Sequence, residues 1–178
     1  MQIYKDEVSL AGLVARVVLR ARDVGQPAVV IASEPSRQKN VDALQAEHIA
    51  LDGSEGRDVE IIDAHHVLHD IMVSDRPDPA RFRHVVGSML ARVCRGRQPC
   101  VAVVYSDLAD VLVRANNTSA ALSLEILWNR LATEHTFSLV CGYAASDLDE
   151  RSPTYFGSAW VALGRIMLDT DLLGPCSR

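Results

Sequence analysis

The sequence predicts an α/β fold with a largely parallel central sheet that helices flank on both faces. Short apolar runs of strand length, such as residues 28–32 and 100–105, alternate with longer stretches in which apolar residues recur at helical spacing. The connections between them are short, which is typical of strands joined by crossover helices. The chain has 178 residues, of which 48% are apolar, so it is long enough for one domain with a sizeable core.

The first half of the chain contains three predicted strands. Residues 1–4 form the first, and a helix with one buried stripe follows and ends near Gly25. The run after Pro27 predicts a strand that is buried on both faces. A turn at residues 33–36 leads to a helix over 37–46, a polar loop over 51–57 and a strand over 59–62. Asp63 then caps a short helix over 64–72.

The second half begins with a break at residues 75–79, where Asp78 caps a helix and Pro79 takes its first position. That helix continues to Val93. A strand over 100–105, a helix over 106–114, a helix capped by Thr118 and a strand over 137–141 follow. We predict a sensory domain over 1–150 and a C-terminal helical extension over 151–178, with a helix near 155–168. The extension packs on the same domain or on a second copy in a homodimer.

Charge and cysteine content exclude several classes of protein. The formal net charge of −5 argues against a direct nucleic-acid partner, which needs a concentrated basic face. No apolar run approaches the roughly 20 residues that span a bilayer, and the N-terminus does not resemble a signal peptide. The four cysteines, Cys94, Cys100, Cys141 and Cys176, form no Cys-x-x-Cys pair. We therefore expect reduced thiols in a cytoplasmic protein.

The candidate binding residues follow from the topology of a parallel sheet. Ligands of such sheets favour the crevice beyond the carboxyl ends of the strands. The polar or aromatic residues that the sequence places at those ends are Tyr4, Asp6, Ser33, Glu34, Tyr105 and Asp107.

Tests for specific chemistry favour no catalytic site. A Gly-x-x-x-x-Gly-Lys-Ser/Thr loop is missing between the first strand and the first helix, where residues 4–9 carry two acids instead. Asp107 is interpreted first as an acid at a helix N-terminus, Glu125 as a solvated helix residue and Trp128 as core. His65 and His69 are four residues apart and could share a metal, but a histidine-rich polar face is the simpler interpretation. We expect no cofactor.

Several segments of the chain resemble the MEDS domain, a sensory domain named from methanogens, methylotrophs and the regulator DcmR. They are Ile3-Tyr4-Lys5-Asp6-Glu7, residues 25–32, residues 71–82, residues 121–131 and Phe137-Ser138-Leu139-Val140-Cys141-Gly142-Tyr143. The resemblance implies a RecA/KaiC-like three-layer core, here without a functional phosphate-binding loop. It also implies sensing of a small molecule, for which hydrocarbon derivatives have been proposed.

We therefore expect a non-catalytic sensory and regulatory domain that binds a small-molecule signal. Its output passes to a separate regulatory protein, such as a histidine kinase, an anti-sigma factor or a transcription regulator. Three alternatives stay open. The first is a ligand-free protein-interaction module of a histidine-kinase or sigma-factor pathway. The others are a nucleotide-binding RecA-like domain and a metal-binding regulator.

Overall fold

A computed structural model of the chain describes residues 2–4, 7–34, 36–49 and 58–144. Their elements are, in order, β1 (Gln2–Tyr4), α1 (Glu7–Asp23), β2 (Ala28–Ala32), α2 (Ser36–Ala46), β3 (Val59–Asp63), α3 (Ala64–Ile71), β4 (Met72–Val73), β5 (Arg76–Pro77), α4 (Pro79–Val93), β6 (Ala102–Ser106), α5 (Leu108–Arg114), α6 (Thr118–Leu131) and β7 (Phe137–Ala144). The predicted extension over 151–178, including its helix, lies outside the described residues.

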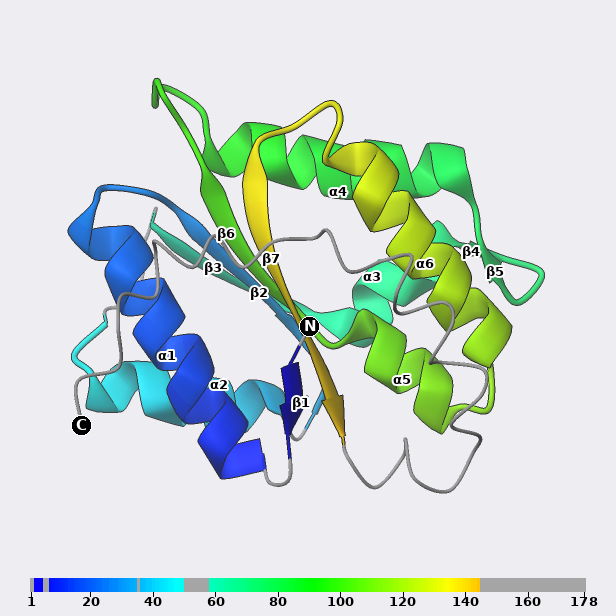
Figure 1. Cartoon of the computed structure of the whole chain (residues 1–178), viewed down its shortest axis with the longest axis horizontal. Coiled ribbons are helices and arrows are strands. Elements are labelled where there is room, and N and C mark those ends of the chain that lie inside the picture. Colours follow the sequence, from blue (N-terminus) through cyan, green and yellow to red (C-terminus); the bar gives the residue numbers. More distant parts are fainter. Residues whose placement is uncertain (1, 5–6, 35, 50–57, 145–178) are drawn as a thin grey trace.

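The main sheet has five strands in the order β1-β7-β6-β2-β3, and all of its pairings are parallel. Helices α1 and α2 cover one face, and α3, α4, α5 and α6 cover the other, so the domain has three layers (Figure 1). The predicted α/β fold with a parallel sheet is confirmed. No helix in the described residues is long and apolar enough to cross a membrane.

The central strands β2 and β6 are buried along their whole length. Because side chains alternate between the faces of a strand, they supply two separate cores. Val29 and Ile31 pack under α3 to α6, whereas Val30 and Ala32 pack under α1 and α2. The continuous apolar run in the sequence is therefore the signature of a strand covered on both faces.

Helix ends follow the predicted capping with one exception. Asp63 and Asp78 each accept a hydrogen bond from the backbone N–H three residues on, and Pro79 opens α4. The cap of α6 is Asn117, not Thr118, because the Asn117 side chain accepts from the Ala120 N–H. The Asn117 side chain therefore caps this helix in place of the predicted Thr118 hydroxyl.

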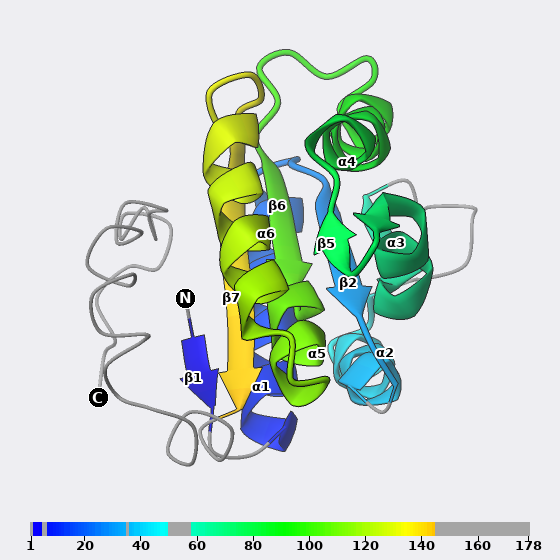
Figure 2. The same ribbon diagram turned by 90° about the vertical axis from the view of Figure 1, so that its right-hand side faces the viewer.

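A two-stranded antiparallel hairpin, β4–β5, was not predicted from the sequence. The hairpin contains Met72, which was predicted as the last residue of a helix, and part of the predicted break at residues 75–79. It lies beside α6 (Figure 2). Ser74 and Asp75 both have positive φ, at 47° and 62°. Such a turn normally carries glycine or asparagine, so the Ser74-Asp75 pair does not indicate a hairpin. The Asn117 amide donates to the Asp75 carbonyl at 2.7 Å and holds the turn.

The prediction that all cysteines are reduced is wrong for Cys94 and Cys100, which form a disulfide. The chain turns back from the C-terminal end of α4 toward β6 and brings the two Cα atoms to 5.7 Å, within the usual range for a disulfide. Cys141 is a buried free thiol.

Removing this disulfide is expected to lower the stability of the domain. Its cysteines are six residues apart, and the loop-entropy estimate for so short a loop is about 2 kcal/mol. The Cys94→Ala/Cys100→Ala variant should lose that amount in urea-induced unfolding, and reductant should then have no further effect on it. Equal stability of the variant and the oxidised protein would contradict the prediction.

Candidate functional site

The chain reverses its direction across the sheet between β2 and β6. From β2 it crosses to β3 on one side, and from β6 it crosses to β7 on the other. In open parallel sheets this reversal leaves a crevice at the carboxyl ends of the two strands, where ligands bind. The two residues that directly follow these strands are Ser33 and Asp107.

Ser33 and Asp107 are hydrogen-bonded to each other across this point. The Ser33 backbone N–H donates to Asp107 Oδ2 at 2.9 Å, and the Ser33 hydroxyl donates to the same oxygen at 2.8 Å. Both residues are buried. Asp107 also occupies the N-cap position of α5, but its side chain makes no capping hydrogen bond. The carboxylate therefore ties β6 to the loop after β2.

Burial raises the pKa of the Asp107 carboxyl to about 6. The two hydrogen bonds from Ser33 act in the opposite direction, because they favour the ionised form. The nearby Asp110 raises the pKa further, and Arg114 lowers it. Asp107 thus changes its charge close to neutral pH.

Three buried side-chain atoms near this point lack a hydrogen-bond partner in the part of the chain that the structure describes. They are Asp107 Oδ1, Ser36 Oγ and Asn40 Oδ1. Ser36 and Asn40 lie one turn apart on α2, on the same buried stripe as Leu44. Buried polar atoms in native proteins are nearly always paired, so each of these calls for a partner. The sequence analysis did not single out Ser36 and Asn40, although their spacing of four residues places both on one helix face.

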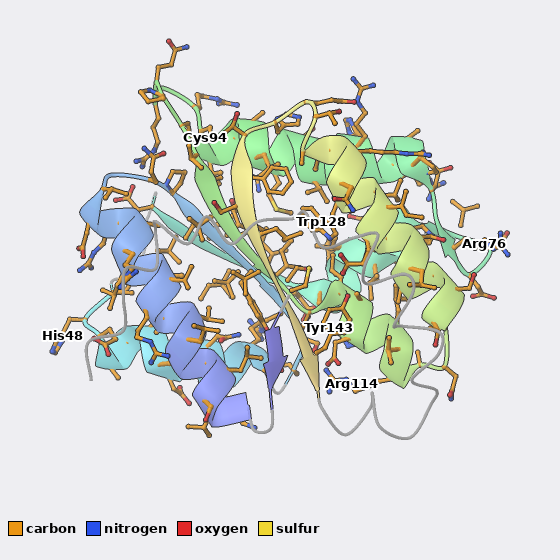
Figure 3. All side chains as sticks on the ribbon, in the orientation of Figure 1. His48, Arg76, Cys94, Arg114, Trp128 and Tyr143 are labelled. Carbon is orange, nitrogen blue, oxygen red and sulfur yellow. A yellow bond between two sulfur atoms is a disulfide. The ribbon has the colours of Figure 1, made fainter. Side chains whose placement is uncertain are left out.

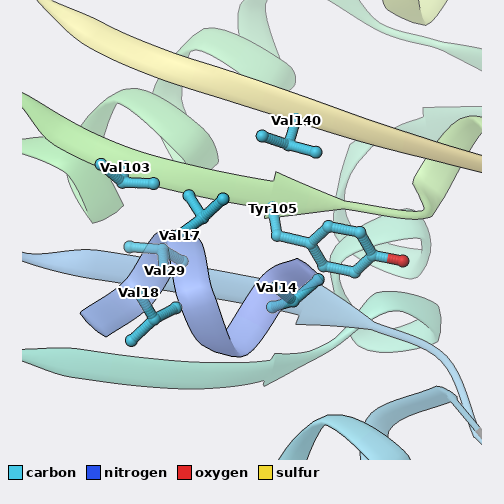
Figure 4. Close-up of a pocket in the computed structure, with 7 residues that line it drawn as sticks. All are labelled: Val14, Val17, Val18, Val29, Val103, Tyr105 and Val140. Carbon is cyan, nitrogen blue, oxygen red and sulfur yellow. The ribbon is translucent and has the colours of Figure 1, made fainter. Parts of the chain in front are cut away.

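Tyr105 faces the α1 and α2 layer and borders a small apolar cavity (Figure 4). The cavity volume is about 10 Å³, which is enough for a single water. Val14, Val17, Val18, Val29, Val103 and Val140 complete its lining. The ring passes close to Gly142 on β7, where an added Cβ would lie 2.8 Å from the Tyr105 hydroxyl. A Cβ at this position would therefore force the Tyr105 ring to shift.

The other predicted residues are placed as follows. Tyr4 belongs to β1, and its side chain lies outside the described part of the chain, as does Asp6. Glu34 is exposed and pairs with Arg37 at 2.5 Å on the surface. His65, His66 and His69 are exposed on α3, and the described residues contain no group of three potential ligands for a metal ion. Of the predicted set, the structure therefore joins Ser33 with Asp107.

The interpretation of Glu125 as a solvated residue is wrong. Glu125 is buried between α6 and β7 and accepts a hydrogen bond from the Tyr143 hydroxyl. Burial raises the pKa of Glu125, and the bonds from Tyr143 and Cys141 oppose that shift. Trp128, on the same helix, is core as predicted and meets Phe82 edge to face (Figure 3). The helical pattern placed Glu125 on α6 but could not show that β7 carries two donors opposite it.

These features define an open parallel α/β domain with a buried polar site at the reversal point of its sheet. Residues 1–153 match the family model described as MEDS, the MEthanogen/methylotroph, DcmR Sensory domain. The chain therefore belongs to the MEDS family, and the family's description indicates a sensory role. Searches of curated proteins and of solved structures found no significant match.

Asp107→Asn is expected to change how stability depends on pH. The wild-type carboxyl binds its proton more tightly when folded (pKa about 6) than when unfolded (3.8). The carboxyl therefore contributes fully to stability below pH 4, and this contribution is lost as pH rises to about 6. The free energy of unfolding falls by about 3 kcal/mol over this range. In urea unfolding from pH 4 to 7, the free energy of unfolding of the variant should rise by this amount relative to that of the wild type. Parallel pH profiles would contradict a raised pKa.

Gly142→Ala is expected to destabilise the domain by about 1–3 kcal/mol, because its methyl group would overlap the Tyr105 hydroxyl. Tyr105→Phe removes that hydroxyl. The double variant should therefore recover part of the loss, which thermal unfolding of the four proteins in a double-mutant cycle would measure. If the stability changes of the two single variants simply add in the double variant, the two side chains do not interact.

Proposed function

We propose that this MEDS-family chain is a non-catalytic sensor that binds a small molecule at the carboxyl ends of β2 and β6. The proposal rests on three buried atoms, in Ser36, Asn40 and Asp107, that have no hydrogen-bond partner in the described parts of the chain. Burying these atoms without hydrogen bonds costs free energy, and a ligand that supplies the missing bonds offsets that cost. The reversal point of the sheet is where such ligands bind in other open α/β folds. A RecA/KaiC-like core is part of the proposal, and the three-layer parallel architecture supports it.

The atoms of the site favour a ligand that donates hydrogen bonds. Asn40 Oδ1 is an acceptor, ionised Asp107 is an acceptor only, and the Ser36 hydroxyl can serve either way. Tyr105, which lies on β6 two residues before Asp107, borders the valine-lined cavity, which would suit an apolar portion that extends from these atoms into the α1 and α2 layer. A weakly polar alcohol, amide or amine with a short hydrocarbon part fits this combination.

Binding such a ligand in this cavity requires a conformational change. The cavity of about 10 Å³ is far smaller than the several hundred Å³ of a typical ligand pocket. Because Tyr105 borders it, and α1 forms its other wall, a shift of either would enlarge it. A change at α1 or in the loop after β2 would reach the surface, where a separate regulatory protein could respond.

The small volume of the cavity also favours a second candidate, a ligand-free protein-interaction module. In that case Ser33 and Asp107 would serve only to close the sheet. The two functions differ in whether Ser36 and Asn40 contribute to stability in the absence of any ligand.

A matched pair of serine variants separates these functions. Ser33→Ala removes a made hydrogen bond and should cost about 1–2 kcal/mol, whereas Ser36→Ala removes an unpaired hydroxyl and should leave stability unchanged or higher. Native mass spectrometry of the protein purified from cells should show an added mass that denaturation releases. Both variants should retain less of it.

The outcomes distinguish the candidates. A clean unliganded mass, together with a loss of stability in Ser36→Ala, would make Ser36 a structural residue and would favour the interaction module. A released mass of a nucleotide would favour a nucleotide-binding domain instead.

A further inference from the structure

The Cys94–Cys100 disulfide lies at the opposite end of the sheet from the candidate site. It joins the C-terminal end of α4 to the residues before β6 (Figure 3), and both cysteines are half-buried. The residues between them are mostly exposed. A dissolved thiol can therefore approach this bond, whereas the free thiol of Cys141 is enclosed in the core.

The chain around the disulfide is basic although the protein is acidic overall. No acidic residue occurs between Asp78 and Asp107, and five arginines lie in that interval. Arg92 pairs with Glu60 at 2.5 Å, and Arg97 pairs with Asp58 and donates to the Gly25 carbonyl. Arg95, next to Cys94, is exposed and makes no ion pair with the described residues. Among the described residues, one positive charge without an acidic partner thus stands beside the disulfide.

We propose that Cys94–Cys100 is a thiol–disulfide exchange site that reacts preferentially with small anionic thiols. The incoming thiolate attacks one sulfur, the S–S bond breaks, and the second cysteine leaves as a thiolate. A second thiol attacks the mixed disulfide, so both cysteines are reduced and the two thiols leave joined as one oxidised disulfide. The Arg95 charge attracts an anionic thiol and stabilises the departing thiolate.

Reduction acts on the amino ends of the central strands. Arg97 lies within the disulfide loop and holds the Gly25 carbonyl and the Asp58 side chain, which precede β2 and β3. β6 begins two residues after Cys100 and ends next to Asp107. Opening the bond frees this loop without touching the polar site, so the inference does not depend on the proposed ligand.

The test compares three small thiols that differ mainly in charge: 3-mercaptopropionate, 2-mercaptoethanol and cysteamine. Rates of reduction of the full chain are followed by quenched alkylation and mass spectrometry. Each rate is divided by the rate at which the same thiol reduces a neutral reference disulfide at equal thiolate concentration. At low salt the anionic thiol should be favoured over the cationic one by about fivefold, as expected for one unit charge within about 10 Å.

Two exposed arginines provide a matched comparison. Arg95→Ala should bring the ratio of the two rates close to one, whereas Arg81→Ala, about 21 Å away along α4, should leave the preference unchanged. Equal normalised rates for the three thiols, or equal effects of both variants, would overturn the preference. Resistance to millimolar thiols, or four free thiols in the isolated protein, would overturn the exchange site itself.

Discussion

The burial of β2 and β6 between two layers of helices is the constraint on which the other features depend. A polar side chain within a strand that is enclosed on both faces costs free energy, because it loses water and must find a partner. β2 is apolar throughout, and the polar side chains of β6, those of Tyr105 and Ser106, lie toward its carboxyl end. Ser33 and Asp107 directly follow these strands, and their hydrogen bonds close the gap between two strands whose connections lead in opposite directions.

The two ends of the sheet differ in how completely their polar groups are paired. At the amino ends, the Arg97 guanidinium meets Asp58 and the Gly25 carbonyl, and the Gln26 side chain accepts from the Val101 N–H. At the carboxyl ends, buried oxygen atoms of three side chains have no partner among the described residues. Proteins tend to accept such local costs at functional sites, which supports the proposed binding site at the carboxyl ends.

Glu125 is a second buried acid, and it lies against β7. Glu125 and Tyr143 are hydrogen-bonded under α6, and Asp110 acts on the pKa of both Tyr143 and Asp107. Asp110 itself is held by Arg114 at 2.6 Å. A charge placed beside Asp107 would therefore influence groups on both sides of α5. This connection links the proposed binding site electrostatically to the layer formed by α5 and α6.

The sequence by itself determined the order of the elements apart from the β4–β5 hairpin, the parallel sheet, the Asp63 and Asp78 caps and the resemblance to MEDS. These rest on local patterns of apolar spacing and capping, which act within a few residues. Only the tertiary structure decided that Ser33 bonds Asp107, that Glu125 is buried against Tyr143, and that Cys94 meets Cys100. It also buried Ser36 and Asn40 with side-chain oxygens that have no hydrogen-bond partner among the described residues. Each of these depends on which segments meet in space, and helical or strand periodicity shows the face of an element but not what lies opposite it.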